Sequence, residues 1–89
     1  MEIRHAPERR RFESDHPDPG VLNYAVRGEG RLELKSTEVP ASLEGQGVGS
    51  ALAREAMDYA RAHDYRVIAT CPFVRGWLER HPEYSDIVE

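Results

Sequence analysis

The chain has 89 residues, of which 39% are hydrophobic and 31% are charged, and its formal net charge is −4. A chain of this length holds one hydrophobic core, so we expect a single domain over residues 1–89. The composition excludes a disordered chain, and the acidic balance argues against a nucleic-acid-binding protein.

The cysteine content and the apolar stretches indicate where such a protein works. Its single cysteine, Cys71, excludes an internal disulfide and favours a reducing compartment, the cytoplasm. No apolar secretory segment follows residues 1–5, and residues 45–53, the longest uncharged stretch of the second half, are too short to cross a bilayer. We therefore expect no membrane association. The only basic run, residues 9–11, is interpreted as a solvated turn or strand edge.

The first forty residues have the pattern of strands and turns. Residues 11–13 predict a short strand, which the turn-forming residues 15–20 bring to an end. Two longer extended segments, residues 21–26 and 31–39, are joined by a loop with two glycines, and this arrangement predicts an antiparallel hairpin. Pro40 ends the second segment because it cannot donate a hydrogen bond to a strand ladder.

The second half has a different periodicity. Apolar residues recur at three- and four-residue spacing over residues 48–63, which predicts an amphipathic helix. The apolar run in residues 65–71 predicts a strand covered on both faces. Pro72 begins a second helix, with Cys71 as its cap, and Pro82 stops it. The buried side of this helix is expected to consist of Phe73, Val74, Trp77 and Leu78. The order of elements predicts a small α+β (α/β-like) domain with a mixed sheet.

A glycine-rich loop, Gly45-Gln46-Gly47-Val48-Gly49-Ser50, lies between a predicted strand and the first predicted helix. Its glycines leave the backbone bare, so that N–H groups and the positive end of the helix dipole can hold an anion such as a pyrophosphate. The sequence lacks the Gly-Lys-Ser/Thr ending of a P-loop and the spacing of a dinucleotide fingerprint. By itself, such a loop is equally consistent with a flexible connection.

The residues around this loop resemble a known family. Val39-Pro40, followed by Glu44 and the loop itself, is similar to the acetyl-CoA signature of the GNAT superfamily of N-acetyltransferases. Gly47 and Gly49 match that signature, whereas Glu44 stands where Gln or Arg is usual. Further blocks resemble the small stand-alone GNAT-like proteins, and the resemblance covers residues 22–88. These blocks are Thr37-Glu38-Val39-Pro40, Asp58-Tyr59-Ala60-Arg61, Cys71-Pro72-Phe73-Val74 and His81-Pro82-Glu83-Tyr84.

The resemblance implies a minimal GNAT fold, in which an antiparallel sheet is extended by a parallel strand and flanked by two helices. It implies acetyl-CoA as cosubstrate and no metal. The pyrophosphate would bind the backbone of Gly45, Gln46, Gly47, Val48, Gly49 and Ser50. The pantetheine arm would pair with the strand that ends at Val39, in a cleft where this strand splays from its neighbour. The Val39 N–H would support the oxyanion of the transition state.

Two residues are the candidates for catalysis, and each has a structural alternative. Cys71 at a helix start could protonate the leaving thiolate or carry the acyl group, or it could simply be a buried strand-end residue. Glu38 could deprotonate the incoming amine if a bulge, usual in this family, turns it away from the core, or it could be a solvated carboxylate. We expect Tyr84 to pack and His81 to close a helical turn.

The sequence therefore predicts an acetyl-CoA-dependent N-acetyltransferase that acts on a small-molecule or peptide amine. The two alternatives are a non-catalytic CoA-binding or sensing module and a protein-interaction domain that has kept the fold. Relatives often have His where this chain has Ser36, and the chain would be impaired if that His were essential. The exposed edges of a minimal sheet also give a reason for homodimer formation.

Overall fold

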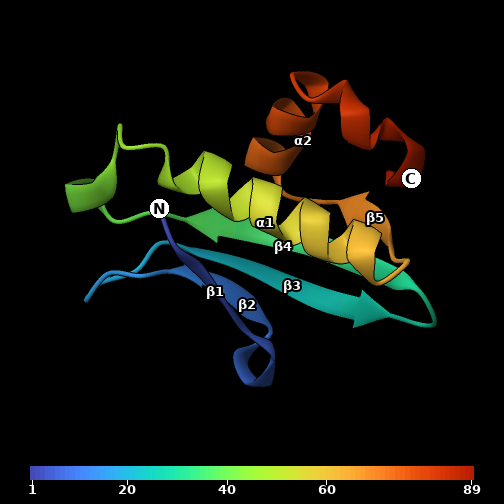
Figure 1. Cartoon of the computed structure of the whole chain (residues 1–89), viewed down its shortest axis with the longest axis horizontal. Coiled ribbons are helices and arrows are strands. Elements are labelled where there is room, and N and C mark those ends of the chain that lie inside the picture. Colours follow the sequence, from blue (N-terminus) through green and yellow to red (C-terminus); the bar gives the residue numbers. More distant parts are fainter.

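The computed structural model describes all 89 residues and contains five strands and two α-helices. The strands form one sheet in the order β1-β2-β3-β4-β5, antiparallel from β1 to β4 and parallel between β4 and β5 (Figure 1). This mixed sheet with two helices is the α+β arrangement that the resemblance implies. The bounds are β1 Ile3–Ala6, β2 Arg11–Ser14, β3 Val21–Arg27, β4 Arg31–Glu38, α1 Val48–Ala62, β5 Arg66–Ala69 and α2 Pro72–Glu79.

The predicted hairpin and the first predicted helix are present. Strands β3 and β4 pair with each other and are joined by a loop that contains Gly28 and Gly30. These glycines have φ values of 56° and 75°, in the left-handed region that favours glycine. Helix α1 lies across one face of the sheet and β5 returns beside β4 (Figure 1). The apolar residues of the sheet and of both helices form one cluster. It includes Leu22, Leu34, Leu52, Val67 and Trp77, each with no exposed surface. Neither α1 nor any other helix is long and apolar enough to cross a membrane.

Several sequence predictions were wrong in detail. Strand β1 and the final 3-10 turn, Pro82–Ile87, were not predicted. Strand β5 is shorter than expected and is less buried than a strand covered on both faces, since Val67 is buried but Ile68 and Ala69 are only half-buried. Phe73 does not join the buried side of α2 and is 42% exposed.

The basic run lies in a turn and at a strand, as interpreted. Arg9 ends the 3-10 turn Pro7–Arg9, and Arg11 begins β2. Both arginines donate to the carboxylate of Glu13, which is only 3% exposed, with Nε–Oε2 distances of 2.9 Å from Arg9 and 2.6 Å from Arg11. The hydrogen bond from Arg11 is the main reason why the pKa of Glu13 lies below its ordinary value. Part of the run therefore compensates a buried charge of the protein itself.

Candidate active site

The central feature is the separation of β4 from β5. The two strands pair from Arg31–Arg66 to Leu34–Ala69, and the Cys71 N–H then donates to the Leu34 carbonyl at 3.0 Å. Beyond Leu34, β4 continues to Glu38 paired only with β3. The edge of β4 that faces away from β3 therefore has no strand partner in this stretch, and its backbone groups are available to an extended ligand.

A bulge occurs where β4 leaves β5. Tyr24 faces Leu34, but the next pair is Asn23 with Ser36, so Lys35 is an extra residue of β4. The extra residue reverses the alternation, which would otherwise have placed Glu38 on the core face with Leu34. Glu38 is exposed and lies instead on the open face of the sheet, the face opposite α1, as the expected bulge would place it.

The Asn23 side chain organises the open face beside the bulge. Its Nδ2 lies 3.1 Å from Ser36 Oγ and 3.1 Å from Glu38 Oε2, so one amide holds both side chains. Sequence reasoning missed Asn23, because its partners lie 13 and 15 residues away and only the strand register brings them together. The arrangement offers a positioned carboxylate that can accept a proton from a group arriving at the open face.

Cys71 lies on the other side of β4. It occupies the N-cap position of α2, as predicted, but its side chain makes no capping hydrogen bond. The thiol is 3% exposed and lies 3.3 Å from Thr37 Oγ1. Thr37 faces Leu22 of the core, whereas Glu38 bonds Asn23 on the open face. The two candidate catalytic residues thus flank the end of β4 from opposite faces.

The glycine loop presents a series of free donors. The first hydrogen bond of α1 runs from the Ala51 N–H to the Gly47 carbonyl, and no N–H group from Gly45 to Ser50 donates to a backbone carbonyl. Gly45 and Gly47 have φ values of 78° and 79°, which L side chains rarely adopt. The Val39 N–H also donates to no backbone carbonyl. These are the N–H groups that the resemblance assigned to the pyrophosphate and the oxyanion.

A hollow of about 310 Å³ lies against this loop and is lined by Val39, by the loop and by two residues of the α2 segment, Phe73 and Arg80. The Phe73 ring covers the start of α1 so closely that a Cβ on Gly49 would lie 2.9 Å from it. Arg80 forms no ion pair, although the Glu44 carboxylate lines the same hollow. No sequence pattern indicated Phe73 or Arg80 here, because only folding brings α2 to the loop.

The remaining candidates have structural roles. Tyr84 is 5% exposed and donates to Asp58, and burial together with this carboxylate raises its pKa. His81 Nδ1 lies 2.7 Å from the Trp77 carbonyl and its ring stacks on the Trp77 indole, so it closes the last turn of α2. The Ser50 hydroxyl accepts a hydrogen bond from Trp77 Nε1 at 2.8 Å.

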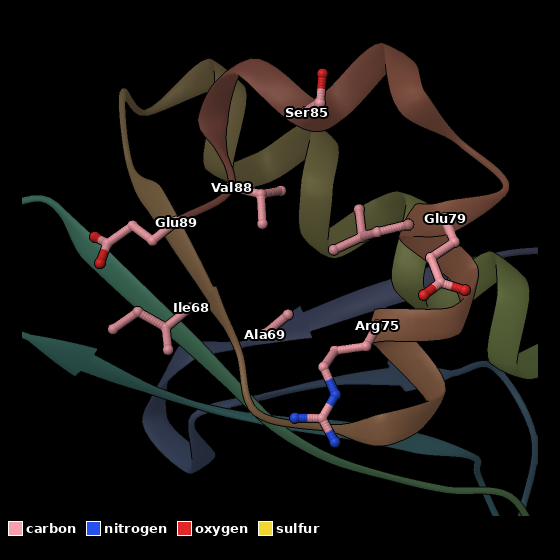
Figure 2. Close-up of a pocket in the computed structure, with 8 residues that line it drawn as sticks. Ile68, Ala69, Arg75, Glu79, Ser85, Val88 and Glu89 are labelled. Carbon is pink, nitrogen blue, oxygen red and sulfur yellow. The ribbon is translucent and has the colours of Figure 1, made fainter.

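The largest hollow, of about 520 Å³, lies elsewhere, between β5, α2 and the C-terminal segment (Figure 2). Ile68, Ala69, Leu78 and Val88 form its apolar part, and it contains none of the predicted site residues. The structure has no group of three or more His, Cys, Asp or Glu side chains that could hold a metal ion.

The chain is similar in sequence and in fold to known proteins. The chain is 29% identical to Protein NATD1 of Xenopus tropicalis, over 92% of this chain and 78% of that protein, and 28% identical to Protein NATD1 of Homo sapiens, over 92% and 75%. A GCN5-like protein of Staphylococcus aureus, solved by NMR, superposes with a TM-score of 0.77 at 26% identity, covering 100% of this chain and 88% of that one. Residues 11–87 match the sequence model of the GCN5-related N-acetyl-transferases. The chain therefore belongs to the GCN5-related N-acetyltransferase family.

Proposed function

We propose that this protein transfers an acetyl group from acetyl-CoA to an amine. The main supporting observation is that β4 loses its β5 partner beside a loop whose N–H groups, from Gly45 to Ser50, are unbonded. A phosphate-binding loop and an unpaired strand edge are the two features that a long phosphopantetheine ligand requires.

In this proposal, each part of the ligand binds to a different group of the chain. The donors from Gly45 to Ser50 bind the pyrophosphate, assisted by the positive end of α1 and the Arg80 guanidinium. The free edge of β4 after Leu34 hydrogen-bonds the amides of the pantetheine arm. The unbonded Val39 N–H donates to the thioester carbonyl and stabilises the oxyanion that forms there.

Glu38 and Cys71, which flank the end of β4, carry out the proton transfers. The neutral amine attacks the thioester carbonyl carbon from the open face, and the C–N bond forms as the C–S bond breaks. Glu38, held by Asn23, takes the proton that the amine nitrogen loses. The thiol of Cys71, on the opposite side of β4, gives a proton to the leaving sulfur. Glu38 then releases its proton to solvent and Cys71 regains one from solvent, so both groups return to their starting state. The products are the N-acetylated amine and CoA.

Titration calorimetry with CoA tests the placement of the ligand. We expect Gly47→Val to weaken CoA binding by about 1–3 kcal/mol, because a β-branched residue strains this left-handed position and blocks the backbone donors. Gly28→Val is the matched control: Gly28 also has a positive φ and open space around it, but it lies in the β3–β4 loop. Equal affinity in the Gly47 variant and the wild type would overturn the placement.

Acetyl transfer to a panel of amines then separates three outcomes. Transfer that depends on Glu38 supports the enzyme. CoA binding without transfer to any amine would indicate a CoA-binding or sensing module. A protein that binds no CoA would be an interaction domain that has kept the fold.

A further inference from the structure

A third hollow, of about 460 Å³, lies on the open face of the sheet. It is lined by three cationic side chains, Arg9, Arg10 and Lys35, together with Asn23, Tyr24, Ala25 and Ser36, and no carboxylate lines it. We call it the basic hollow. A volume of this size suits a small molecule. Its sign of charge is opposite to that of the whole chain, which carries a net charge of −4.

Two of the three cations form no ion pair within the protein, although the Glu33 carboxylate is near enough to Lys35 for their charges to interact. Arg9 pairs with Glu8 and Glu13, at 3.3 and 2.9 Å. Arg10 and Lys35 are exposed and form no ion pair. Charged groups that converge on one hollow without compensation raise the local concentration of ligands of opposite sign. An anionic group is therefore the natural ligand of Arg10 and Lys35.

The backbone at Arg10 is strained. Its φ of 53° lies in the left-handed region, which a non-glycine residue adopts at a cost. Two hydrogen bonds hold this conformation, one from the Arg10 N–H to the Pro7 carbonyl at 3.1 Å and one from the Tyr24 N–H to the Arg10 carbonyl at 3.0 Å. A glycine would serve this turn at less cost. An arginine held here by β3 points to a function of its side chain.

The basic hollow is directly connected to the proposed base. Lys35 is the bulged residue at which β4 leaves β5. Asn23 and Ser36, which line the hollow, are joined to each other and to Glu38 by the two hydrogen bonds of the Asn23 amide. A molecule whose anionic end lies on Arg10 and Lys35 can thus direct its other end past Ser36 toward Glu38.

We propose that the acetyl acceptor is a small amine that also carries an anionic group, a carboxylate or a phosphate. This inference rests on the proposed function and names its substrate class. Arg10 and Lys35 bind the anionic group, and this contact fixes the amine nitrogen on the open face beside Glu38. Orientation of the nucleophile by a remote charged contact is an efficient use of binding energy.

Matched acceptor pairs test the substrate class. Glycine is compared with glycinamide, and O-phosphoethanolamine with ethanolamine, at saturating acetyl-CoA. We expect kcat/KM to be at least about tenfold higher for the anionic member of one pair, and the pair that shows it identifies carboxylate or phosphate. Glycinamide has the more easily deprotonated amine, so a preference for glycine at neutral pH cannot arise from a larger fraction of neutral amine. Equal or higher kcat/KM for both neutral amines would overturn the proposal.

Variants locate the contact. Arg10→Gly removes the charge and relieves the strained φ, so the protein should remain folded while KM for the anionic acceptor rises about tenfold. Asp64→Gly is its matched control, because Asp64 also has a positive φ (59°) but lies after α1. Lys35→Gln should act like Arg10→Gly, whereas Arg66→Gln, which removes an exposed unpaired charge on β5, should not. Equal losses in the variants and their controls would overturn the assignment.

A binding measurement without CoA separates this inference from the proposed function. Two product pairs are titrated into the ¹⁵N-labelled protein: N-acetylglycine with N-acetylglycinamide, and N-acetyl-O-phosphoethanolamine with N-acetylethanolamine. We expect the anionic member of one pair to shift the amides of Asn23, Lys35 and Ser36, its neutral counterpart not to shift them, and Arg10→Gly to abolish the shifts. If these shifts occur but no acetyl is transferred, the basic hollow is an anion-binding site and the proposed enzymatic function is wrong. If acetyl is transferred while neither anionic compound shifts any of these amides, the inference about the acceptor is wrong and the proposed enzyme is supported.

Discussion

Glu44 is the residue that departs from the acetyl-CoA signature, and in the structure a positive charge, that of Arg80, lies near it. The carboxylate of Glu44 and the guanidinium of Arg80 line the same hollow beside the glycine loop. They are not bonded to each other, and Arg80 has no other ion pair. A bound pyrophosphate would therefore be attracted by one of these charges and repelled by the other, and the two residues should have opposite effects on CoA affinity.

Substitution of each residue tests this expectation. Arg80→Gln should weaken CoA binding by about 1 kcal/mol and make it less sensitive to salt, while Glu44→Gln should strengthen binding by a similar amount. Calorimetry at low and high ionic strength measures both effects, with Arg66→Gln as the control for loss of one positive charge. If Arg80→Gln keeps the affinity and salt dependence of the wild type, Arg80 lies outside the phosphate site.

Cys71 is buried against Thr37, so an alkylating reagent reaches its thiol only when the surrounding segment opens. We expect Cys71→Ser to keep CoA binding but reduce acetyl transfer by about 10²-fold if the thiol is the proton donor. Cys71→Ala should lower the rate at least as much without unfolding the protein, which circular dichroism can verify. Bound CoA should protect the thiol from alkylation.

Two results would change the role of Cys71. A thioester on Cys71 in mass spectra after treatment with acetyl-CoA would make it an acyl carrier rather than a proton donor. Acetyl transfer by Cys71→Ala at the wild-type rate would leave it a packing residue, and Glu38 with a bound water would then be the better catalytic candidate.

At the scale of elements, the hydrophobic pattern of contiguous residues predicted the strands and helices whose signal is local. The alternation in β3, the helical spacing in α1 and the glycine loop are all properties of contiguous residues. Strand β1 was missed because its inward positions are Ile3 and His5, and a histidine does not count as apolar. In the structure the half-buried His5 ring stacks on the core residue Phe12 at a centroid distance of 4.5 Å.

The candidate site was predictable to the same extent. The loop from Gly45 to Ser50 was found because its donors are consecutive in sequence. Asn23, Phe73 and Arg80 join the site from β3 and α2 only after folding, so no spacing rule could indicate them. The contact between Thr37 and Cys71 likewise spans 34 residues.

The position of His5 in β1 leads to a prediction for the pH dependence of stability. His5 Nε2 hydrogen-bonds the hydroxyl of Tyr24, and burial, with a smaller effect of His63, lowers the pKa of His5 below its ordinary value. The unfolded chain therefore binds this proton more readily than the folded one. Stability from His5 is complete above the ordinary histidine pKa, about 6.5, and declines as the pH falls below it.

Urea unfolding at pH 7.5 and pH 5.5 checks this prediction. The wild type should lose stability between the two values. His5→Phe keeps the ring stack and should lose about 1 kcal/mol at pH 7.5, because the Tyr24 hydroxyl loses its partner. The variant should show a smaller difference between the two pH values than the wild type. An unchanged difference would mean that His5 does not cause it.

At the scale of the whole molecule, the sheet has two edge strands, and the chain treats them differently. The outer edge of β1 is open, whereas β5 is partly covered by the C-terminal residues. Val88 forms a parallel bridge with Val67, and the Glu89 N–H donates to the Val67 carbonyl at 2.9 Å. The Glu89 carboxylate accepts two hydrogen bonds from Arg31, at 2.8 and 2.7 Å. If the expected homodimer forms by strand pairing, β1 is therefore the edge strand more available for it.

Removal of residues 88–89 should both destabilise the protein and expose the edge of β5. The deletion breaks the Val67 hydrogen bond and uncovers the apolar floor that Ile68 and Ala69 form next to Val88 (Figure 2). We expect a loss of about 1–3 kcal/mol in urea unfolding and increased self-association in sedimentation velocity, because an uncovered edge pairs with other strands. Arg31→Gln is the control, since it removes the exposed ion pair but keeps the backbone bridge, and it should destabilise the protein less than the deletion does and cause no association. If the deletion and Arg31→Gln behave alike, the C-terminal residues contribute through charge alone and the edge of β5 is protected by its own half-buried side chains.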